Sequence, residues 1–222
     1  LLRDRRAGCC GRGRIQVDVH VAERADLRPH ETHDRALALG NTSAHVNIDK
    51  HIPHGGGLGG GSTDAATALH WAGYPVDAES LAQAADLGAD ISFCLIGGRA
   101  RVTGIGEVIE PLPHIDQAVT LIIPPLAVST PAAYRAWDDL GGPTVDGPND
   151  LEPAALAVEP QLAWWRDAIT ERTGTAPTLA GSGATWFTKG KHSNALIDLV
   201  DMGATVVVAH VVPSDVATNQ AH

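Results

Sequence analysis

The residues best suited to chemistry lie in one glycine stretch, residues 55–61, in which six of the seven residues are glycine. Glycine adopts positive φ at little cost, and its N–H can approach a ligand without hindrance from a Cβ. Ser62 follows as a typical N-cap residue, and the alanine-rich run to Ala72 favours a helix. A glycine loop that leads into a helix N-terminus predicts an anion site, most often for phosphate.

Three general interpretations of the glycine stretch compete. A Walker A loop ends in Gly-Lys-Ser/Thr, and no lysine follows these glycines, so that class is excluded. The spacing of Gly55, Gly57 and Gly60 matches the dinucleotide-binding fingerprint, but residues 73–79 lack the hydrophobic strand and terminal acid that should follow. A flexible linker is disfavoured because a helix cap and a strong helix follow at once. The phosphate-loop interpretation therefore remains.

Asp90 is a second candidate, placed just after a predicted helix that Asp77 would cap and Gly88 would end. Phosphoryl transfer to a hydroxyl needs a group beside the phosphate site that accepts or orients the hydroxyl proton. One aspartate at a helix–strand junction suits this role. The alternative is that Asp90 only caps a local turn.

Composition narrows the choice of partners. With 16 Lys and Arg against 26 Asp and Glu, the net charge of −10 argues against nucleic acid or anionic membranes as partners. Three cysteines in 222 residues favour a reducing compartment, and the 11 histidines show no metal-ligand spacing. There is no apolar run of about 18 residues and no secretory signal, so we expect a cytoplasmic protein without a protein-bound metal.

Periodicity and turn residues predict the elements that would position these groups. The apolar runs and alternations favour strands, including a hairpin at residues 97–107. Thr130 would cap a helix with Pro131 at its first position, and Asn149 or Asp150 would cap the next. The expected strands are residues 14–21, 44–50, 118–123 and 205–212. Three further helices are expected: one that begins near residue 152, one at residues 159–173 and one at residues 194–202.

The glycine stretch and its flanks resemble the phosphate loop of the GHMP kinases. The match runs from Ile52 to Ala66, and residues 47–50 before it fit the same family. The run Gly-Ala-Asp-Ile-Ser-Phe at residues 88–93 is similar to the family motif that carries its catalytic aspartate. Residues 97–107, 130–131, 149–152 and 181–184 match further family motifs in the same order.

The N-terminal part departs from the family pattern at named positions. Arg14 stands in the place of the family's active-site lysine, and Gln16 in that of its asparagine. The segment that holds cytosine in the family corresponds to residues 26–33, which contain no tyrosine. The interval between that segment and the glycine stretch is also shorter than in the family.

The resemblance implies an α+β protein of two two-layer halves, residues 1–115 and 116–222, with the active site in the cleft between them. It also implies ATP and Mg2+ as cofactors, with Asp90 and Arg14 as the catalytic residues. The ATP-binding residues it implies are Lys50, Pro53, His54, Gly55, Gly56, Gly57, Leu58, Gly59, Gly60, Gly61, Ser62 and Thr63. Thr130, Gly181 and Ser182 are the implied substrate-binding residues.

The members of the family that this chain resembles most phosphorylate the 2-hydroxyl of 4-diphosphocytidyl-2-C-methyl-D-erythritol in the non-mevalonate isoprenoid pathway. We therefore expect this small molecule as the acceptor. Another GHMP kinase, of the homoserine or mevalonate type, is one alternative. A nucleotide-binding protein without kinase activity is the other, because an arginine at position 14 cannot reproduce a compact ammonium group. The oligomeric state is not fixed by the sequence.

Overall fold

The fold was analysed in a computed structural model that describes residues 15–18, 40, 45–48, 55–142 and 147–213. The chain divides into two compact units. The first comprises Leu1–His51, Gly59–Ile115 and Val212–His222, and the second comprises Ile52–Leu58 and Asp116–Val211. The boundary between Leu58 and Gly59 falls inside the glycine stretch.

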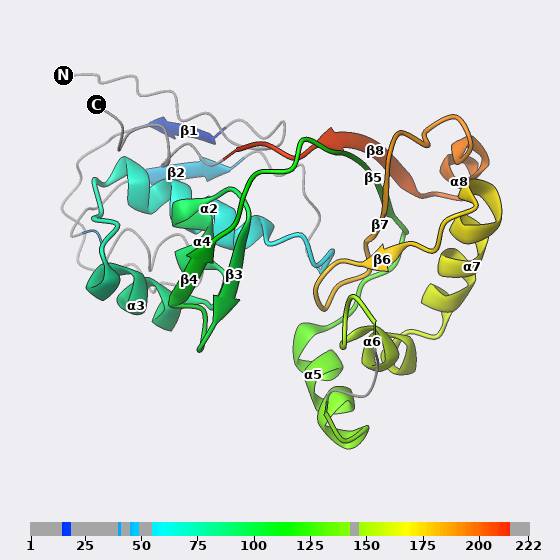
Figure 1. Cartoon of the computed structure of the whole chain (residues 1–222), viewed down its shortest axis with the longest axis horizontal. Coiled ribbons are helices and arrows are strands. Elements are labelled where there is room, and N and C mark those ends of the chain that lie inside the picture. The colour runs from blue at the N-terminus through cyan, green and yellow to red at the C-terminus, as the bar shows by residue number, and fades with distance from the viewer. Residues whose placement is uncertain (1–14, 19–39, 41–44, 49–54, 143–146, 214–222) are drawn as a thin grey trace. The chain divides into compact units, whose positions relative to one another are not determined.

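The first unit combines helices with two small antiparallel sheets (Figure 1). Strands β1 (Ile15–Asp18) and β2 (His45–Ile48) form one pair, and β3 (Ala100–Thr103) and β4 (Val108–Pro111) form the other. The helices are α2 (Gly60–Trp71), α3 (Ala78–Leu87) and α4 (Ile91–Ile96). Their apolar faces meet in a buried core built from Ala65, Ala66, Ala68, Leu69, Tyr74, Ala84, Ile91 and Leu95.

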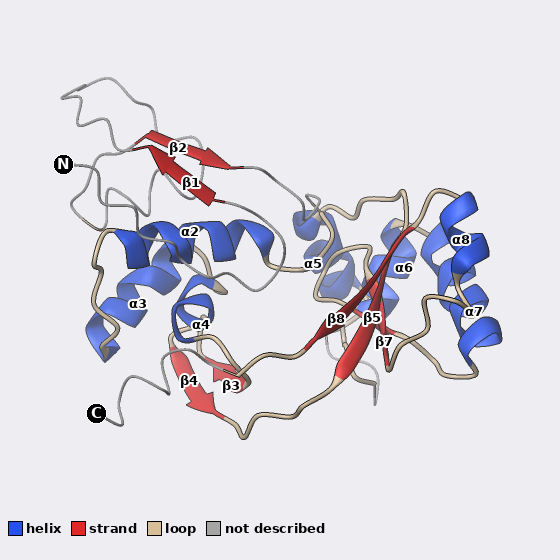
Figure 2. Cartoon of the chain, turned by 90° about the horizontal axis from the view of Figure 1, so that it is seen from above, coloured by secondary structure: helices blue, strands red, loops and turns tan. Residues whose placement is uncertain are grey.

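The second unit is built on a four-stranded antiparallel sheet in the order β6-β7-β5-β8. Its strands are β5 (Ala118–Ile123), β6 (Thr178–Leu179), β7 (Trp186–Lys189) and β8 (Thr205–His210). The helices are α5 (Thr130–Asp139), α6 (Glu152–Val158), α7 (Gln161–Thr173) and α8 (Ile197–Asp201). Figure 2 shows α7 and α8 lying together beside this sheet.

One hydrophobic core joins the sheet to the helices of the second unit. Ile122 of β5 and Trp186 of β7 are fully buried and pack in the same cluster as Leu162 and Ile169 of α7 and Leu199 of α8. Burying side chains of this size stabilises the fold by about 1.5–3 kcal/mol each. The strand ends that carry the loops discussed below are therefore firmly anchored.

Mixed helices and antiparallel sheets confirm the predicted α+β class. The helix predicted to begin after Asp77 is confirmed, and the Asp77 carboxylate accepts the N–H of Ser80 at 2.9 Å. The β5 strand and the hairpin are also found where the pattern placed them. Among the described residues, each helix is too short or too polar to traverse a bilayer.

Several predicted boundaries are wrong. Ser62 is not an N-cap, because α2 begins earlier, at Gly60, with Gly59 as its N-cap in the left-handed conformation. Thr130 is already helical and Ser129 holds the N-cap position of α5. The segment after Asp90 is a helix instead of a strand, and α8 is shorter than the helix predicted for residues 194–202.

Candidate functional site

The first half of the glycine stretch is the glycine loop (residues 55–58), and it belongs to the second unit. Gly55 and Gly57 both have a φ of +73°, which glycine adopts without strain. The carbonyls of Gly55 and Gly56 accept hydrogen bonds from the N–H groups of Ala184 and Thr185, each at 3.2 Å. Two segments far apart in the sequence are thus joined through their backbones.

The glycine loop and the Ala180 turn (residues 180–183) also exclude side chains at their contact. A Cβ on Gly57 would lie 1.9 Å from the Ala180 carbonyl oxygen. A Cβ on Gly183 would lie 2.0 Å from the Gly57 nitrogen. Real Cβ atoms do not approach backbone this closely, so both positions require glycine for packing.

Hydroxyl and amide side chains surround the Ala180 turn. The Oγ1 of Thr130 and the Oγ of Ser182 lie 2.9 Å apart and share a hydrogen bond. Two of the three predicted substrate-binding residues are therefore side by side, and Gly181 is adjacent to Ser182 in the chain. The side chain of Asn149 reaches the same turn and donates to the carbonyls of Leu179 and Gly181. Asn149 or Asp150 was predicted to cap α6, and this prediction is wrong, because Leu151 holds the N-cap position.

The second half of the glycine stretch, residues 59–61, forms the N-cap and the start of α2 in the first unit. Gly59 has a φ of +64°, and its carbonyl accepts both the N–H and the Oγ1 hydroxyl of Thr63, at 2.9 and 3.1 Å. The first N–H groups of a helix have no intrahelical acceptor and carry partial positive charge. A Cβ at Gly59 or Gly61 would meet no heavy atom within 4 Å, so space is available for an anion.

Asp90 occupies the N-cap position of α4 but makes no capping hydrogen bond with its side chain, which is exposed. Its surroundings link it to α2. The Sγ of Cys94 lies 3.7 Å from the Oγ1 of Thr63, one turn into α2. Burial raises the pKa of the Cys94 thiol, the Thr63 hydrogen bond opposes this, and the negative charge of Asp90 raises the pKa further. The N–H of Cys94 donates to the Asp90 carbonyl at 3.0 Å, so the residue that contacts Thr63 lies one helical turn after Asp90.

The turn of the β3–β4 hairpin supports the backbone next to Asp90. Gly106 is buried, with a φ of +125°, and a Cβ there would lie 2.0 Å from the carbonyl oxygen of Ala89. The carboxylate of Glu107 accepts the N–H of Ile105 at 2.7 Å and closes the turn. The sequence predicted a structural hairpin at this place, and no periodic signal links it to Asp90.

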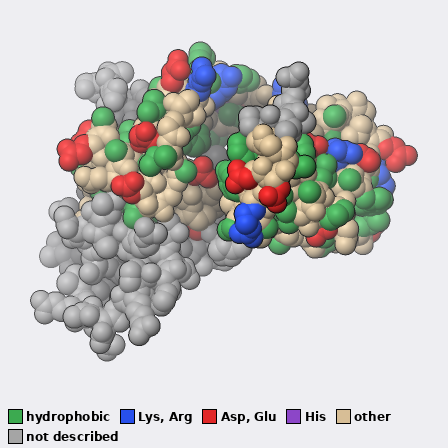
Figure 3. All heavy atoms as spheres, turned by 90° about the horizontal axis from the view of Figure 1, so that it is seen from below, with side chains coloured by type: hydrophobic (Ala, Val, Ile, Leu, Met, Phe, Trp, Pro, Cys, Tyr) green, Lys and Arg blue, Asp and Glu red, His purple; other side chains and the backbone are tan. Residues whose placement is uncertain are grey.

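Possible metal ligands are not clustered in the described part of the chain. No cluster of three or more His, Cys, Asp or Glu side chains that could hold a metal occurs among the residues with a described placement. On the face in Figure 3, Asp and Glu side chains are scattered among hydrophobic and uncharged ones in both described parts. The predicted site residues Arg14, Lys50, Pro53 and His54, and the 26–33 segment, lie outside the described residues.

Comparisons with known proteins give a consistent set of matches. Residues 29–98 match the family model of the GHMP kinases N terminal domain. The 4-diphosphocytidyl-2-C-methyl-D-erythritol kinase of Desulfitobacterium hafniense (strain Y51) is 38% identical over 170 residues, which is 64% of this chain and 59% of the relative. The enzyme of the same name from Listeria innocua serovar 6a is 32% identical over 205 residues, covering 78% of this chain and 70% of the relative.

Two solved structures share the fold. A crystal structure of 4-(cytidine 5'-diphospho)-2C-methyl-D-erythritol kinase aligns with a TM-score of 0.69 and 26% identity, covering 89% of this chain and 85% of that one. A homoserine kinase from Cytophaga hutchinsonii aligns with a TM-score of 0.57 and 17% identity over 82% of this chain and 75% of that one. The chain spans about three fifths of the length of the first curated relatives, 59% and 63%.

Proposed function

The chain belongs to the GHMP kinase family, and we propose that it transfers the γ-phosphoryl group of ATP to the 2-hydroxyl of 4-diphosphocytidyl-2-C-methyl-D-erythritol. The observation that carries the proposal lies in the first unit, where the Thr63–Cys94 contact joins α2, with its open N-terminus, to α4, whose first turn begins at the exposed Asp90. The choice of acceptor rests on the names of the curated relatives and of the 26% identical structure.

The phosphates of ATP would bind the free N–H groups at the start of α2. Positive helix ends attract phosphate, and the open space beside Gly59 and Gly61 leaves room for it. The hydroxyl of Ser62 is half-exposed and is available as a further donor, whereas the hydroxyl of Thr63 is already bonded to Gly59. A chain of net charge −10 needs such a local device to hold a polyanion.

Mg2+ fits this arrangement as an ion held mainly by the nucleotide. Mg2+ keeps several waters and is usually bound through substrate phosphates and one or two carboxylates. The ion would then be held by the phosphates of the nucleotide and by water, and Asp90 would remain available to the acceptor. When bound, the ion supplies charge neutralisation of the phosphates.

Asp90 would receive the proton of the acceptor hydroxyl. The hydroxyl oxygen forms the new P–O bond, the bond between the γ-phosphorus and the β–γ bridging oxygen breaks, and ADP leaves with the bonding electrons. The carboxylate is exposed and not engaged in capping, so it is free to face a substrate. Thr130, Gly181 and Ser182 would contact the acceptor, and Arg14 would take the lysine's place.

The remaining predictions belong to the same proposal. Lys50, Pro53, His54 and residues 55–63 would together surround the nucleotide. The division into residues 1–115 and 116–222 is supported by the two compact units, except that Ile52–Leu58 and Val212–His222 each belong to the other unit.

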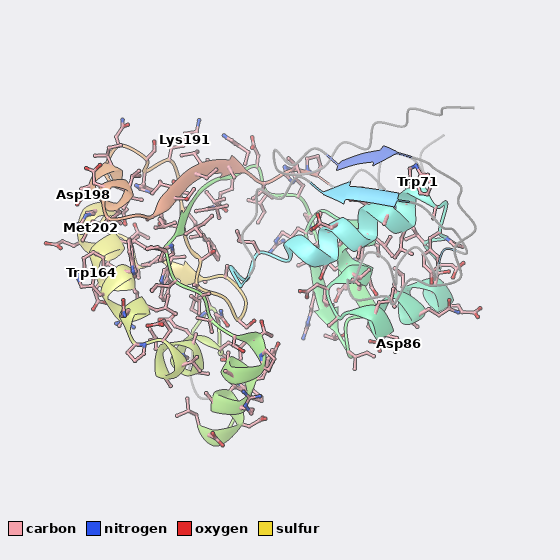
Figure 4. All side chains as sticks on the ribbon, turned by 180° about the vertical axis from the view of Figure 1, so that it is seen from behind. Trp71, Asp86, Trp164, Lys191, Asp198 and Met202 are labelled. Atoms are coloured by element: carbon pink, nitrogen blue, oxygen red, sulfur yellow. The ribbon has the colours of Figure 1, made fainter. Side chains whose placement is uncertain are left out.

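The test is ADP release with Mg-ATP and diphosphocytidyl-methylerythritol, comparing the protein with its Asp90→Asn variant. Loss of the proton acceptor lowers kcat by about 10²–10⁴-fold. The matched control is Asp86→Asn, an exposed aspartate on α3 (Figure 4), which should leave kcat unchanged. Both variants should bind Mg-ATP as the unmodified protein does.

The other outcomes discriminate among the alternatives. Release that depends on homoserine or mevalonate, and not on diphosphocytidyl-methylerythritol, would assign the chain to another GHMP kinase. Stabilisation by Mg-ATP without release for any acceptor would make it a nucleotide-binding protein without kinase activity. Equal activity of the Asp90→Asn variant would reject the role of Asp90.

A further inference from the structure

We infer that Asn149 is a positioning residue that holds the Ala180 turn against the glycine loop and thereby sets the affinity for nucleotide. The tether itself follows from contacts within the second unit alone. Its effect on nucleotide affinity rests on the proposed function. No part of the inference requires Asn149 to touch a substrate.

Asn149 uses its whole amide group. The Nδ2 donates to the carbonyl of Leu179 at 3.0 Å and to the carbonyl of Gly181 at 2.7 Å. The Oδ1 accepts the N–H of Leu151 at 2.9 Å, at the entry to α6. With the amide turned over, an oxygen would face two carbonyls and an NH2 would face an N–H, so only this orientation satisfies all three partners.

The two carbonyls that Asn149 binds flank Ala180 in the chain. The Ala180 carbonyl accepts the N–H of Gly183 at 3.2 Å and is the atom that leaves no room for a Cβ on Gly57. Fixing Leu179 and Gly181 therefore fixes the peptide group against which Gly57 packs. A movement of this turn would pass directly to the glycine loop, because the contact is backbone against backbone.

The glycine loop is hydrogen-bonded to the segment that follows the Ala180 turn. The carbonyls of Gly55 and Gly56 accept hydrogen bonds from the N–H groups of Ala184 and Thr185, which follow the Ala180 turn directly. Loop amides point usefully at a ligand only when the backbone is held in one conformation. Asn149 supplies that restraint from a separate helix entry, about 30 residues before the turn, as the sequence separations of 30 and 32 indicate.

Two variants of Asn149 separate its bonds to Leu179 and Gly181 from its bond to Leu151 at the start of α6. Asn149→Asp is isosteric and keeps the acceptor for Leu151, but it sets a carboxylate against two carbonyls. Asn149→Ser can still accept the Leu151 N–H as a short turn motif, but it cannot reach Leu179 or Gly181. Asn194→Asp is the matched control, because Asn194 is an exposed asparagine of the same unit and the charge change is the same.

The experiment combines amide hydrogen exchange with a titration of Mg-ATP on the full chain. In both Asn149 variants the amides of Ala184 and Thr185 should exchange at least tenfold faster, while the β5 amides should exchange as before. The dissociation constant for Mg-ATP should rise about tenfold, the loss expected for two hydrogen bonds. Asn194→Asp should change neither quantity.

Every other result would reject either the inference about Asn149 or the proposed function. Unchanged exchange at Ala184 and Thr185, or faster exchange throughout the unit, would overturn the inference, as would failure of both variants to fold. Local loosening with unchanged Mg-ATP affinity would overturn it too. Local loosening in a protein that binds no Mg-ATP even when unmodified would support the tether and reject the proposed function instead.

Discussion

Gly57 and Gly59 have similar φ angles, +73° and +64°, but their surroundings are opposite. A Cβ on Gly57 would collide with the backbone of Ala180 and Gly183, whereas a Cβ on Gly59 would meet nothing within 4 Å. The comparison separates two reasons for glycine in one stretch. Gly57 is needed for packing in the second unit, and Gly59 provides a left-handed cap with open space beside it in the first.

A similar contrast between packed backbone and open space occurs at Ala89 and Asp90. The backbone at Ala89 is held by the buried Gly106, but the Asp90 side chain is exposed and makes no capping bond. A fixed backbone with a free carboxylate suits a group that must exchange a proton with a substrate. The site thus combines tightly packed backbone with unengaged reactive groups.

The largest effect should come from Gly57→Ala. The collision with backbone at 1.9 Å cannot be relieved by a side-chain movement, so we expect about 3 kcal/mol of lost stability and a loss of nucleotide binding. Gly59→Ala adds only left-handed strain of about 1–2 kcal/mol. Its methyl group enters the space proposed for phosphate, so nucleotide affinity should fall more than stability.

Thermal melts and Mg-ATP titrations of the two variants measure both quantities. Equal losses of stability in Gly57→Ala and Gly59→Ala would contradict the proposed difference between the two glycines. A Gly59→Ala variant that melts close to the unmodified protein and still binds Mg-ATP poorly would support it.

A smaller effect is expected from Gly106→Ala, which acts on the Asp90 backbone. The added Cβ would displace Ala89, and a shift on the order of 1 Å in a catalytic group costs about 10²-fold in rate. We expect kcat for ADP release to fall by roughly 10–100-fold with little change in the affinity for Mg-ATP. Gly73→Ala is the control, because Gly73 has a φ of +75° and open space around it.

Steady-state kinetics with both substrates distinguish the two variants. If Gly106→Ala retained full kcat, the hairpin turn would not support Asp90. If Gly73→Ala lost as much activity, backbone strain anywhere in the first unit would explain the effect.

The smallest effect tests the electrostatic link between Asp90 and Cys94. Burial first, and the Asp90 charge in addition, raise the pKa of the Cys94 thiol above its ordinary value of 9.0. Because thiolate is the reactive form, Cys94 should be alkylated slowly at pH 8, and faster as the pH rises. Asp90→Asn removes a charge that opposes the thiolate, so the pKa falls and alkylation should quicken about threefold.

Mass spectrometry of the peptide that contains Cys94 measures this rate separately from the other cysteines. Asp86→Asn should leave it unchanged. Slower alkylation in Asp90→Asn would contradict the sign of the interaction.

The parts of the fold that the sequence predicted are those whose signals are local. Asp77 stands three residues before the N–H that it caps, so the pattern contains both partners. The apolar run of β5 likewise carries its own evidence. The six-residue helix α4 was expected as a strand, because a short apolar run does not distinguish the two by periodicity.

Ser62 was misplaced for a different physical reason. The helix extends back through Gly60 and Gly61, residues of low helix propensity, because the Gly59 carbonyl bonds Thr63 twice. The long-range contacts correspond to no pattern within any single segment of the sequence. The tertiary structure alone creates these contacts, so no local sequence pattern predicts them. They join Gly57 to Gly183, Gly106 to Ala89, and Asn149 to Leu179 and Gly181.

The backbone bonds from Ala184 and Thr185 to Gly55 and Gly56 also determine when the glycine loop can form during synthesis. A ribosome that adds 5–20 residues per second needs roughly 6–25 s to make the roughly 130 residues that separate the two segments. Helices α2, α3 and α4 are complete on the nascent chain well before that. The emerging protein therefore carries the aspartate and the helix N-terminus first, and its glycine loop gains full backbone support only late in translation.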